Sequence, residues 1–220
     1  SGMILGNHIQ RGALGAAGDI GHVYVGPDDV LCRCGNLGCL EASAGGGALA
    51  DQLRAMGYDT RNGRDVVRLV RAGNTDAVQL IRNAGRLVGR VLAAIVNLLN
   101  PAVIMIGGDV ATAGEELMAG IRETVYGRST ALSTADLRIV PSSLGDRAGI
   151  TGAAAMVIEY VLAPVAVDRG LSTREAVGGR CAPQSATPRE ETASSPLVAS
   201  RRRRRVRQTR KLGGGIDEDR

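Results

Sequence analysis

The chain has 220 residues, 44% of them apolar, and a formal net charge of +5. It has room for one sizeable domain, whose core must be built from Val, Leu, Ile, Ala and Met because Phe and Trp are absent. No apolar run reaches the length that spans a bilayer and no signal-peptide pattern opens the chain, so we expect a cytoplasmic protein with no membrane partner.

The first segment predicts a hairpin followed by a glycine-rich loop. Met3–Leu5 and His8–Gln10 alternate like short strands around the turn-forming pair Gly6-Asn7. Four glycines then recur at every third position, namely Gly12, Gly15, Gly18 and Gly21. Such a loop either turns tightly or approaches a ligand closely. A further short strand is predicted at Val23–Val25, and a turn at 27–29.

One histidine and three cysteines lie close together in the sequence and predict a metal site. They are His22, Cys32, Cys34 and Cys39. Zn²⁺ favours tetrahedral coordination by nitrogen and sulfur, and a Cys₃His set fills all four positions, as structural sites do. The alternative is three small buried residues beside a histidine at a strand end. Because spaced Cys/His sets in cytosolic proteins more often bind metal, we expect structural Zn²⁺.

The remainder of the first 170 residues alternates helices and strands and predicts an α/β fold. The clearest helix runs over Thr75–Leu99 with apolar residues at helical spacing, and Asn100-Pro101 ends it. Its Arg82, Arg86 and Arg90 form a basic stripe that we interpret as a solvated face. The other predicted helices are Ala42–Met56, Arg64–Arg71, Ala113–Tyr126 and Ala148–Leu162, and the other strands are Ala102–Ile106 and Asp136–Val140.

The last 50 residues differ from the rest and are predicted to be a disordered basic tail. Residues 1–170 carry 15 arginines and 16 acidic residues, whereas residues 171–220 carry 12 basic and 6 acidic residues. Pro, Ser, Thr, Gly and Arg dominate this tail, which cannot bury enough apolar surface to offset the entropy of ordering. The run 201–205 could add salt-sensitive affinity for nucleic acid, but an extension without a role is at least as plausible.

Two linked motifs resemble the signature of the ROK family of repressors, open reading frames and kinases. The first is GALGAAGDIGH, which ends at His22, and the second is CRCGNLGCLE, which ends at Glu41. The resemblance covers Ser1 to about Leu171 and implies the C-terminal lobe of an actin-like ATPase (ribonuclease H-like) fold. It also implies that Asp19, His22 and Glu41 contact a sugar or sugar phosphate, that His22 is a metal ligand as well, and that the protein is a homo-oligomer.

The same resemblance leaves two functions open. A ROK sugar kinase would use ATP and Mg²⁺, with Gly107 and Gly108 after a buried strand on the nucleotide side. Its phosphate loop and catalytic Asp are expected before Ser1, and so we expect no kinase activity from this chain alone and no catalytic residue in it. Asp19 stands where the family pattern has Glu, and the segment around it is more similar to ROK transcriptional regulators. We therefore expect a sugar-sensing, subunit-joining lobe whose DNA-binding part is absent from this chain.

Overall fold

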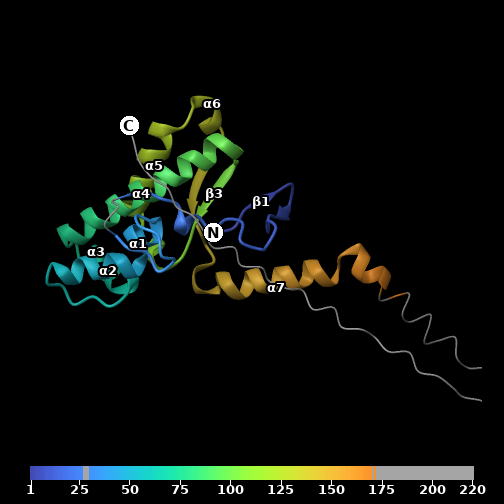
Figure 1. The fold of residues 1–220 in the computed structure, drawn as a ribbon, viewed down its shortest axis with the longest axis horizontal. Coiled ribbons are helices and arrows are strands. Elements are labelled where there is room, and N and C mark those ends of the chain that lie inside the picture. Colours follow the sequence, from blue (N-terminus) through green and yellow to red (C-terminus); the bar gives the residue numbers. More distant parts are fainter. Residues whose placement is uncertain (27–29, 170, 172–220) are drawn as a thin grey trace, which may run out of the picture. The chain divides into compact units, whose positions relative to one another are not determined.

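The structure is a computed structural model that describes residues 1–26, 30–169 and 171 (Figure 1). The helices and strands described below belong to one compact unit, Ser1–Val167. The turn predicted at 27–29, and the disordered tail predicted for 171–220 apart from Leu171, lie outside the described residues. In chain order the elements are β1 (Ile4–Leu5), β2 (His8–Ile9), η1 (Ile20–His22), α1 (Leu40–Ala44), α2 (Gly46–Ala55), α3 (Gly63–Arg71), α4 (Thr75–Leu99), β3 (Val103–Ile106), η2 (Asp109–Ala113), α5 (Glu115–Arg128), α6 (Ala131–Thr134), β4 (Arg138–Pro141), η3 (Gly145–Arg147) and α7 (Ala148–Val161).

The N-terminal hairpin is confirmed. Strands β1 and β2 pair antiparallel, with Ile4 opposite Ile9. The turn residues Gly6 and Asn7 both have positive φ, at 56° and 64°. Two consecutive residues with positive φ match the twist of a two-residue hairpin, which is why glycine and asparagine are favoured there.

The strand predicted at Val23–Val25 is wrong in its extent. The chain first makes the 3₁₀ turn η1, and the following residues pair with the cysteine loop rather than with a strand. Val25 N–H donates to Gly38 O at 2.8 Å and Leu40 N–H donates to Val23 O at 2.9 Å, around a bridge between Tyr24 and Cys39. The pairing is short because Leu40 already begins helix α1.

The single helix predicted over Ala42–Met56 is also wrong, because two helices, α1 and α2, occupy this segment. The break is Gly45, whose ψ of 153° is extended rather than helical. It allows the first turn of α2 to meet the first turn of α3: a Cβ atom on Gly46 would lie 3.2 Å from the Cα of Gly63. The periodicity of apolar residues within this segment could not reveal the break, because the break is linked to the contact of α2 with α3.

The long helix α4 has the bounds that the sequence predicts. Asn74 caps its first turn by accepting a hydrogen bond from Ala77 N–H at 3.0 Å, and Asn100 ends it in the left-handed conformation. Two arginines of the basic stripe do not simply face solvent. Arg86 and Arg82 approach Glu123 of α5 at 3.2 and 3.7 Å, so the stripe helps to join the two helices.

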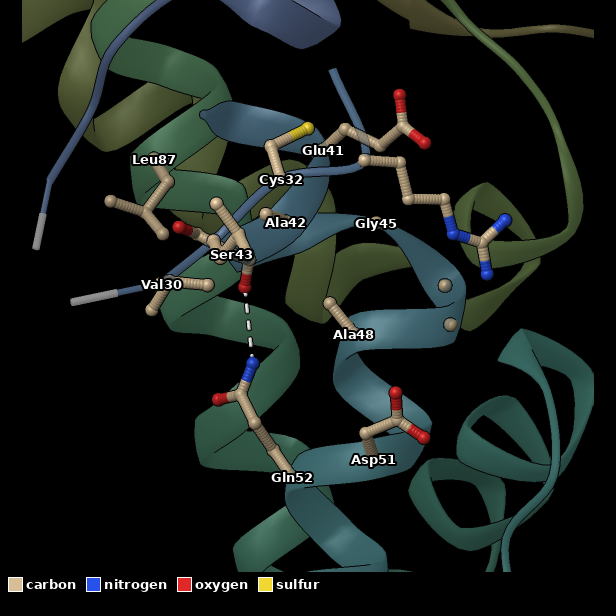
Figure 2. A pocket seen from close by; sticks show the side chains of 14 residues that line it. Val30, Cys32, Glu41, Ala42, Ser43, Gly45, Ala48, Asp51, Gln52 and Leu87 are labelled. Carbon is tan, nitrogen blue, oxygen red and sulfur yellow. Dashed lines mark hydrogen bonds between the residues drawn. The ribbon is translucent and has the colours of Figure 1, made fainter. Parts of the chain in front are cut away.

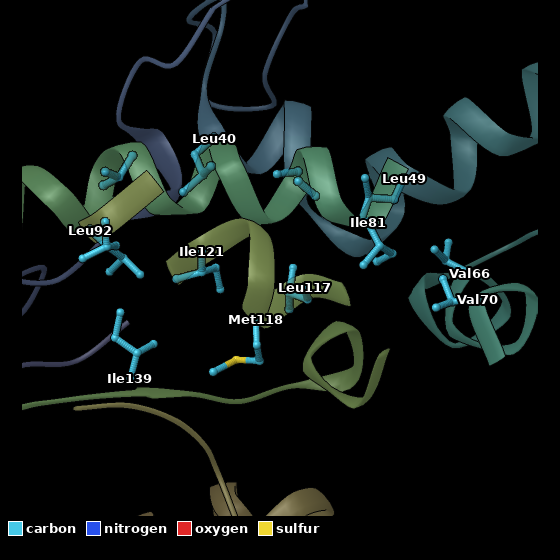
Figure 3. Packing of buried hydrophobic residues seen from close by; sticks show 14 of the residues in the cluster. Leu40, Leu49, Val66, Val70, Ile81, Leu92, Leu117, Met118, Ile121 and Ile139 are labelled. Carbon is cyan, nitrogen blue, oxygen red and sulfur yellow. The ribbon is translucent and has the colours of Figure 1, made fainter. Parts of the chain in front are cut away.

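Helices α4 and α5 pack closely through glycines on both sides of the contact. A Cβ atom on Gly85 would collide with the backbone oxygen of Leu117, and one on Gly120 would collide with that of Arg82. Apolar side chains surround this contact and join α1–α5 and β4 into one core (Figure 3). Those labelled in the figure are Leu40, Leu49, Val66, Val70, Ile81, Leu92, Leu117, Met118, Ile121 and Ile139.

Strands β3 and β4 are parallel neighbours, with Val103 opposite Arg138 and Ile106 opposite Pro141. Parallel strands joined through helix α5, together with the other helices, confirm the α/β class. The strand predicted at Asp136–Val140 is instead formed by Arg138–Pro141, and the sequence did not reveal the short helices η2 and α6. Helix α7 forms where expected, and all of its residues are exposed in the described part of the chain. Among the described residues, no helix combines the length and hydropathy that crossing a membrane requires.

We expect Gly85→Ala to destabilise the fold by about 1–3 kcal/mol, because the added methyl group forces α4 and α5 apart. Urea unfolding followed by circular dichroism measures this change. Gly127→Ala is the matched control in α5: a Cβ atom there meets nothing within 4 Å. That variant should gain about 0.5–1 kcal/mol from its better helix propensity. Equal stability of the Gly85→Ala and wild-type proteins would contradict the close contact.

Candidate functional site

The cysteine loop and η1 bring the four predicted metal ligands together. The ligand atoms of His22, Cys32, Cys34 and Cys39 all lie within 4.8 Å of one another. Cys32 Sγ lies 3.6 Å from His22 Nδ1, and the Sγ atoms of Cys34 and Cys39 lie 3.7 Å apart. One side chain of η1 and three of the cysteine loop therefore form one group of the composition that binds metal ions.

Tight turns in the loop produce this convergence. Cys32 and Gly35 form a turn in which Gly35 N–H donates to Cys32 O at 2.9 Å. Gly35 and Gly38 have φ of 91° and 68°, a conformation that residues with a side chain rarely adopt. The glycines inside the predicted motif are therefore required by the backbone conformation that turns the thiols inward.

The thiols of Cys34 and Cys39 have different environments. Cys34 is exposed, and a hydrogen bond from the backbone N–H of Asn36 lowers its pKa to about 7. Cys39 is buried, and burial raises its pKa to about 12. Burial disfavours the charged thiolate, whereas a donated hydrogen bond stabilises it.

The second nitrogen of the His22 ring faces two carboxylates. Nε2 lies 3.8 Å from Asp19 Oδ2 and 3.9 Å from Glu41 Oε2. Asp19 directly precedes η1, and Glu41 lies in the first turn of α1. The structure thus brings together the three residues expected to contact a sugar. The position of Glu41 also agrees with the simpler interpretation of a carboxylate stabilised at a helix N-terminus.

A cavity of about 670 Å³ opens beside Glu41, between the cysteine loop and the start of α2 (Figure 2). Arg33, Asp51 and Gln52 contribute polar groups to its lining. Gln52 Nε2 donates to the backbone oxygen of Ser43 at 3.1 Å, the bond that is drawn in the figure. The sequence analysis missed these three residues because single polar residues in different elements carry no motif.

The two glycines expected on the nucleotide side lie at the carboxyl end of β3. A Cβ atom on Gly107 would approach the Cβ atom of Ser142 to 3.3 Å, and Gly108 has a φ of 97°. The sequence analysis missed the ion pair beyond them, in which Arg64 Nε lies 2.9 Å from Asp109 Oδ2 and joins α3 to η2. Asp109 raises the pKa of Arg64. In open α/β folds, ligands bind at the carboxyl ends of parallel strands.

Comparisons with known proteins identify regulators and kinases of one family. A model described as the ROK family matches residues 1–160. The xylose repressor of Caldicellulosiruptor bescii is 30% identical in an alignment 175 residues long, which covers 74% of this chain and 44% of the repressor. This chain therefore spans less than half the length of that relative.

Two solved structures are similar in fold as well as in sequence. One is a ROK family transcriptional regulator, a homologue of the E. coli MLC protein, with 30% identity and a TM-score of 0.60 over 64% of this chain and 38% of that chain. The other is a ROK family glucokinase from Streptomyces griseus in complex with glucose and AMPPNP. It has 31% identity and a TM-score of 0.62 over 70% of this chain and 55% of that chain.

In the metal-free protein we expect iodoacetamide to alkylate Cys34 long before Cys39, because the thiolate is the nucleophile. The lowered pKa means that the Cys34 thiolate accumulates above about pH 7, whereas Cys39 stays protonated to about pH 12. Mass spectrometry of timed digests between pH 5 and 10 measures both rates, with free N-acetylcysteine as the reference thiol. Faster labelling of Cys39 than of Cys34 would contradict the described environments.

Proposed function

The chain belongs to the ROK family, and from this premise we propose that it is the sugar-sensing, subunit-joining lobe of a ROK transcriptional regulator. The observation that carries the proposal is the convergence of Asp19, Glu41 and the Nε2 atom of His22 at one point. Their side chains are 62%, 55% and 35% exposed, so a ligand can reach them. The relatives include a xylose repressor and a glucokinase, and both names refer to a sugar. This supports a sugar as the ligand.

The chemistry of this group fits a polyhydroxylated ligand. Ionised carboxylates accept short, charge-assisted hydrogen bonds from hydroxyl groups. The Nε2–H of a neutral His22 whose Nδ1 binds a metal donates to a hydroxyl oxygen. A sugar with neighbouring hydroxyls can therefore satisfy all three side chains at once, which an apolar ligand cannot do.

We propose that structural Zn²⁺ holds this group in place. In a tetrahedral zinc site with Zn–S near 2.3 Å, sulfur atoms lie about 3.8 Å apart and sulfur lies about 3.6 Å from nitrogen. The corresponding separations in this chain are 3.7 Å for Cys34 and Cys39, and 3.6 Å for Cys32 and His22. Because His22 has one nitrogen toward the cysteines and one toward the carboxylates, a bound ion orients the imidazole for the sugar.

The regulator is favoured over a kinase by Asp19. The family pattern has glutamate at this position, and aspartate is shorter by one methylene group. The alternative, the C-terminal lobe of an ATP-dependent sugar kinase in the actin-like ATPase architecture, is supported by the similarity to the glucokinase that was solved with glucose and AMPPNP. Only under that alternative would Gly107 and Gly108 contact ATP with Mg²⁺.

The partners of the whole protein follow from the proposal. A small sugar or sugar phosphate is the effector. Copies of the chain bind one another and form a homo-oligomer. The part of the protein that contacts DNA lies outside the region in which this chain aligns with its relatives. The near-neutral charge of residues 1–170 agrees with that division, because DNA affinity depends on clustered basic residues.

We expect about one Zn²⁺ per chain in protein purified without chelators, measured by plasma emission spectrometry. Cys39→Ser should lose the ion, because only three ligands for it remain. The melting temperature should fall, because the ion no longer holds the cysteine loop together. Cys181→Ser is the matched control and should retain the ion. A zinc content near zero in the wild-type protein contradicts the metal proposal.

Glu41→Gln removes one negative charge and keeps the shape of the side chain, so we expect it to weaken sugar binding about tenfold or more while the zinc content stays unchanged. Calorimetric titration with xylose and glucose measures the effect. Glu116→Gln, in helix α5 and outside the lining of the cavity, is the matched carboxylate control and should bind as the wild type does. Unchanged affinity in Glu41→Gln would leave Glu41 as a carboxylate at the start of a helix.

A coupled ATPase assay with the same sugars separates the regulator from the kinase. Phosphoryl transfer depends on positioned groups from two lobes that close on the substrate, and so we expect no sugar-dependent ATP turnover from the 220-residue chain. Turnover that rises with sugar concentration would support the kinase alternative and contradict the regulator.

A further inference from the structure

Gly21 lies between the two carboxylates of the proposed sugar site. Neither the backbone conformation nor the packing at this position requires glycine. A Cβ atom on Gly21 would lie 3.5 Å from Glu41 Oε2, 3.6 Å from Glu41 Cβ and 3.7 Å from Asp19 Oδ1. We propose that ligand binding requires glycine at position 21, because its missing side chain keeps open the space in which a ligand hydroxyl meets both carboxylates. This inference rests on the proposed sugar site.

The backbone at Gly21 does not require glycine. The residue lies in η1, and its φ is outside the left-handed range that is found at Gly12, Gly15 and Gly18. Packing does not require glycine either, because all three contacts of the added Cβ atom are ordinary van der Waals distances.

Gly18 is the informative contrast within the same loop. Its φ is 92°, and a Cβ atom there would lie 2.6 Å from the backbone oxygen of Ser1. Gly18 is therefore explained by conformation and by close approach, as a tight turn requires. Neither conformation nor close approach explains Gly21. The space beside it is bordered by side-chain atoms of Glu41 and Asp19, including carboxylate oxygens, rather than by backbone.

The imidazole of His22 is not hydrogen-bonded to either of the carboxylates beside this space. His22 Nε2 is 3.8 Å from Asp19 Oδ2 and 3.9 Å from Glu41 Oε2, both beyond hydrogen-bond distance. A hydroxyl group placed among them bridges the gap by donating to a carboxylate and accepting from the imidazole. A methyl group in the same space contacts both carboxylates and offers them no hydrogen bond.

The sign of the charge defines the ligand class further. Two carboxylates at one point repel an anion and attract hydroxyl donors. The ligand portion beside Gly21 is therefore an uncharged, hydroxyl-bearing part of a sugar ring. If the effector is a sugar phosphate, its phosphate group lies elsewhere.

Calorimetric titration of the 220-residue chain with xylose and glucose tests the role of Gly21. We expect Gly21→Ala to bind about tenfold or more weakly than the wild type, with unchanged zinc content and melting temperature. Gly21→Ser should show the same loss, because a side chain of either polarity occupies the space. Gly127→Ala, which is far along helix α5, is the matched glycine control and should bind as the wild type does.

The possible results distinguish the role of Gly21 from the existence of the proposed sugar site. Wild-type affinity in Gly21→Ala and Gly21→Ser would overturn the role of Gly21 and leave the sugar site standing. Loss of zinc or of the folded state in Gly21→Ala would also overturn it, because the added methyl group would then act on the structure and not on the ligand. Absence of sugar binding by the wild type would overturn the proposed function, and the role of Gly21 with it.

Discussion

The close contact between α4 and α5 is the constraint on which the rest of the fold depends. Glycines at 85, 89 and 120 remove the side chains that would hold the two helices apart, and apolar residues from five helices and β4 then pack around the contact. Helix α1 packs on α4 through this core, and α1 carries Glu41. The position of one half of the proposed sugar site is therefore determined by helix packing that lies outside the site.

His22 connects the candidate metal group with the proposed sugar site. Its Nδ1 atom faces the thiol of Cys32, and its Nε2 atom faces the carboxylates of Asp19 and Glu41. In the proposed function, metal ligation and sugar recognition share this one imidazole ring, so the conformation of the cysteine loop would directly affect the geometry of the proposed sugar site. Such rigidity fits the proposed regulator, because side chains that are already in place recognise a ligand most precisely.

Glycine has three different roles along this chain, and sequence alone does not distinguish them. Gly35 and Gly38 serve backbone conformation in the cysteine loop, because their φ angles are positive. Gly85 and Gly120 serve the close approach of two helices. Gly21 serves neither purpose, and the space beside it faces the proposed ligand. The regular spacing of glycines at 12, 15, 18 and 21 thus hides positions of different function.

The sequence by itself determined the features that depend on neighbouring residues: the 25-residue helix α4 with its end at Asn100-Pro101, the hairpin turn at Gly6-Asn7, and the Cys/His set. These depend on periodicity, on cap chemistry and on short spacing, which are local. Only the tertiary structure decided where the helix predicted over 42–56 breaks, that Val23–Val25 pairs with the cysteine loop, and that Arg64 reaches Asp109. Each of these depends on which other segment a residue contacts, and a pattern within one segment does not record its partner.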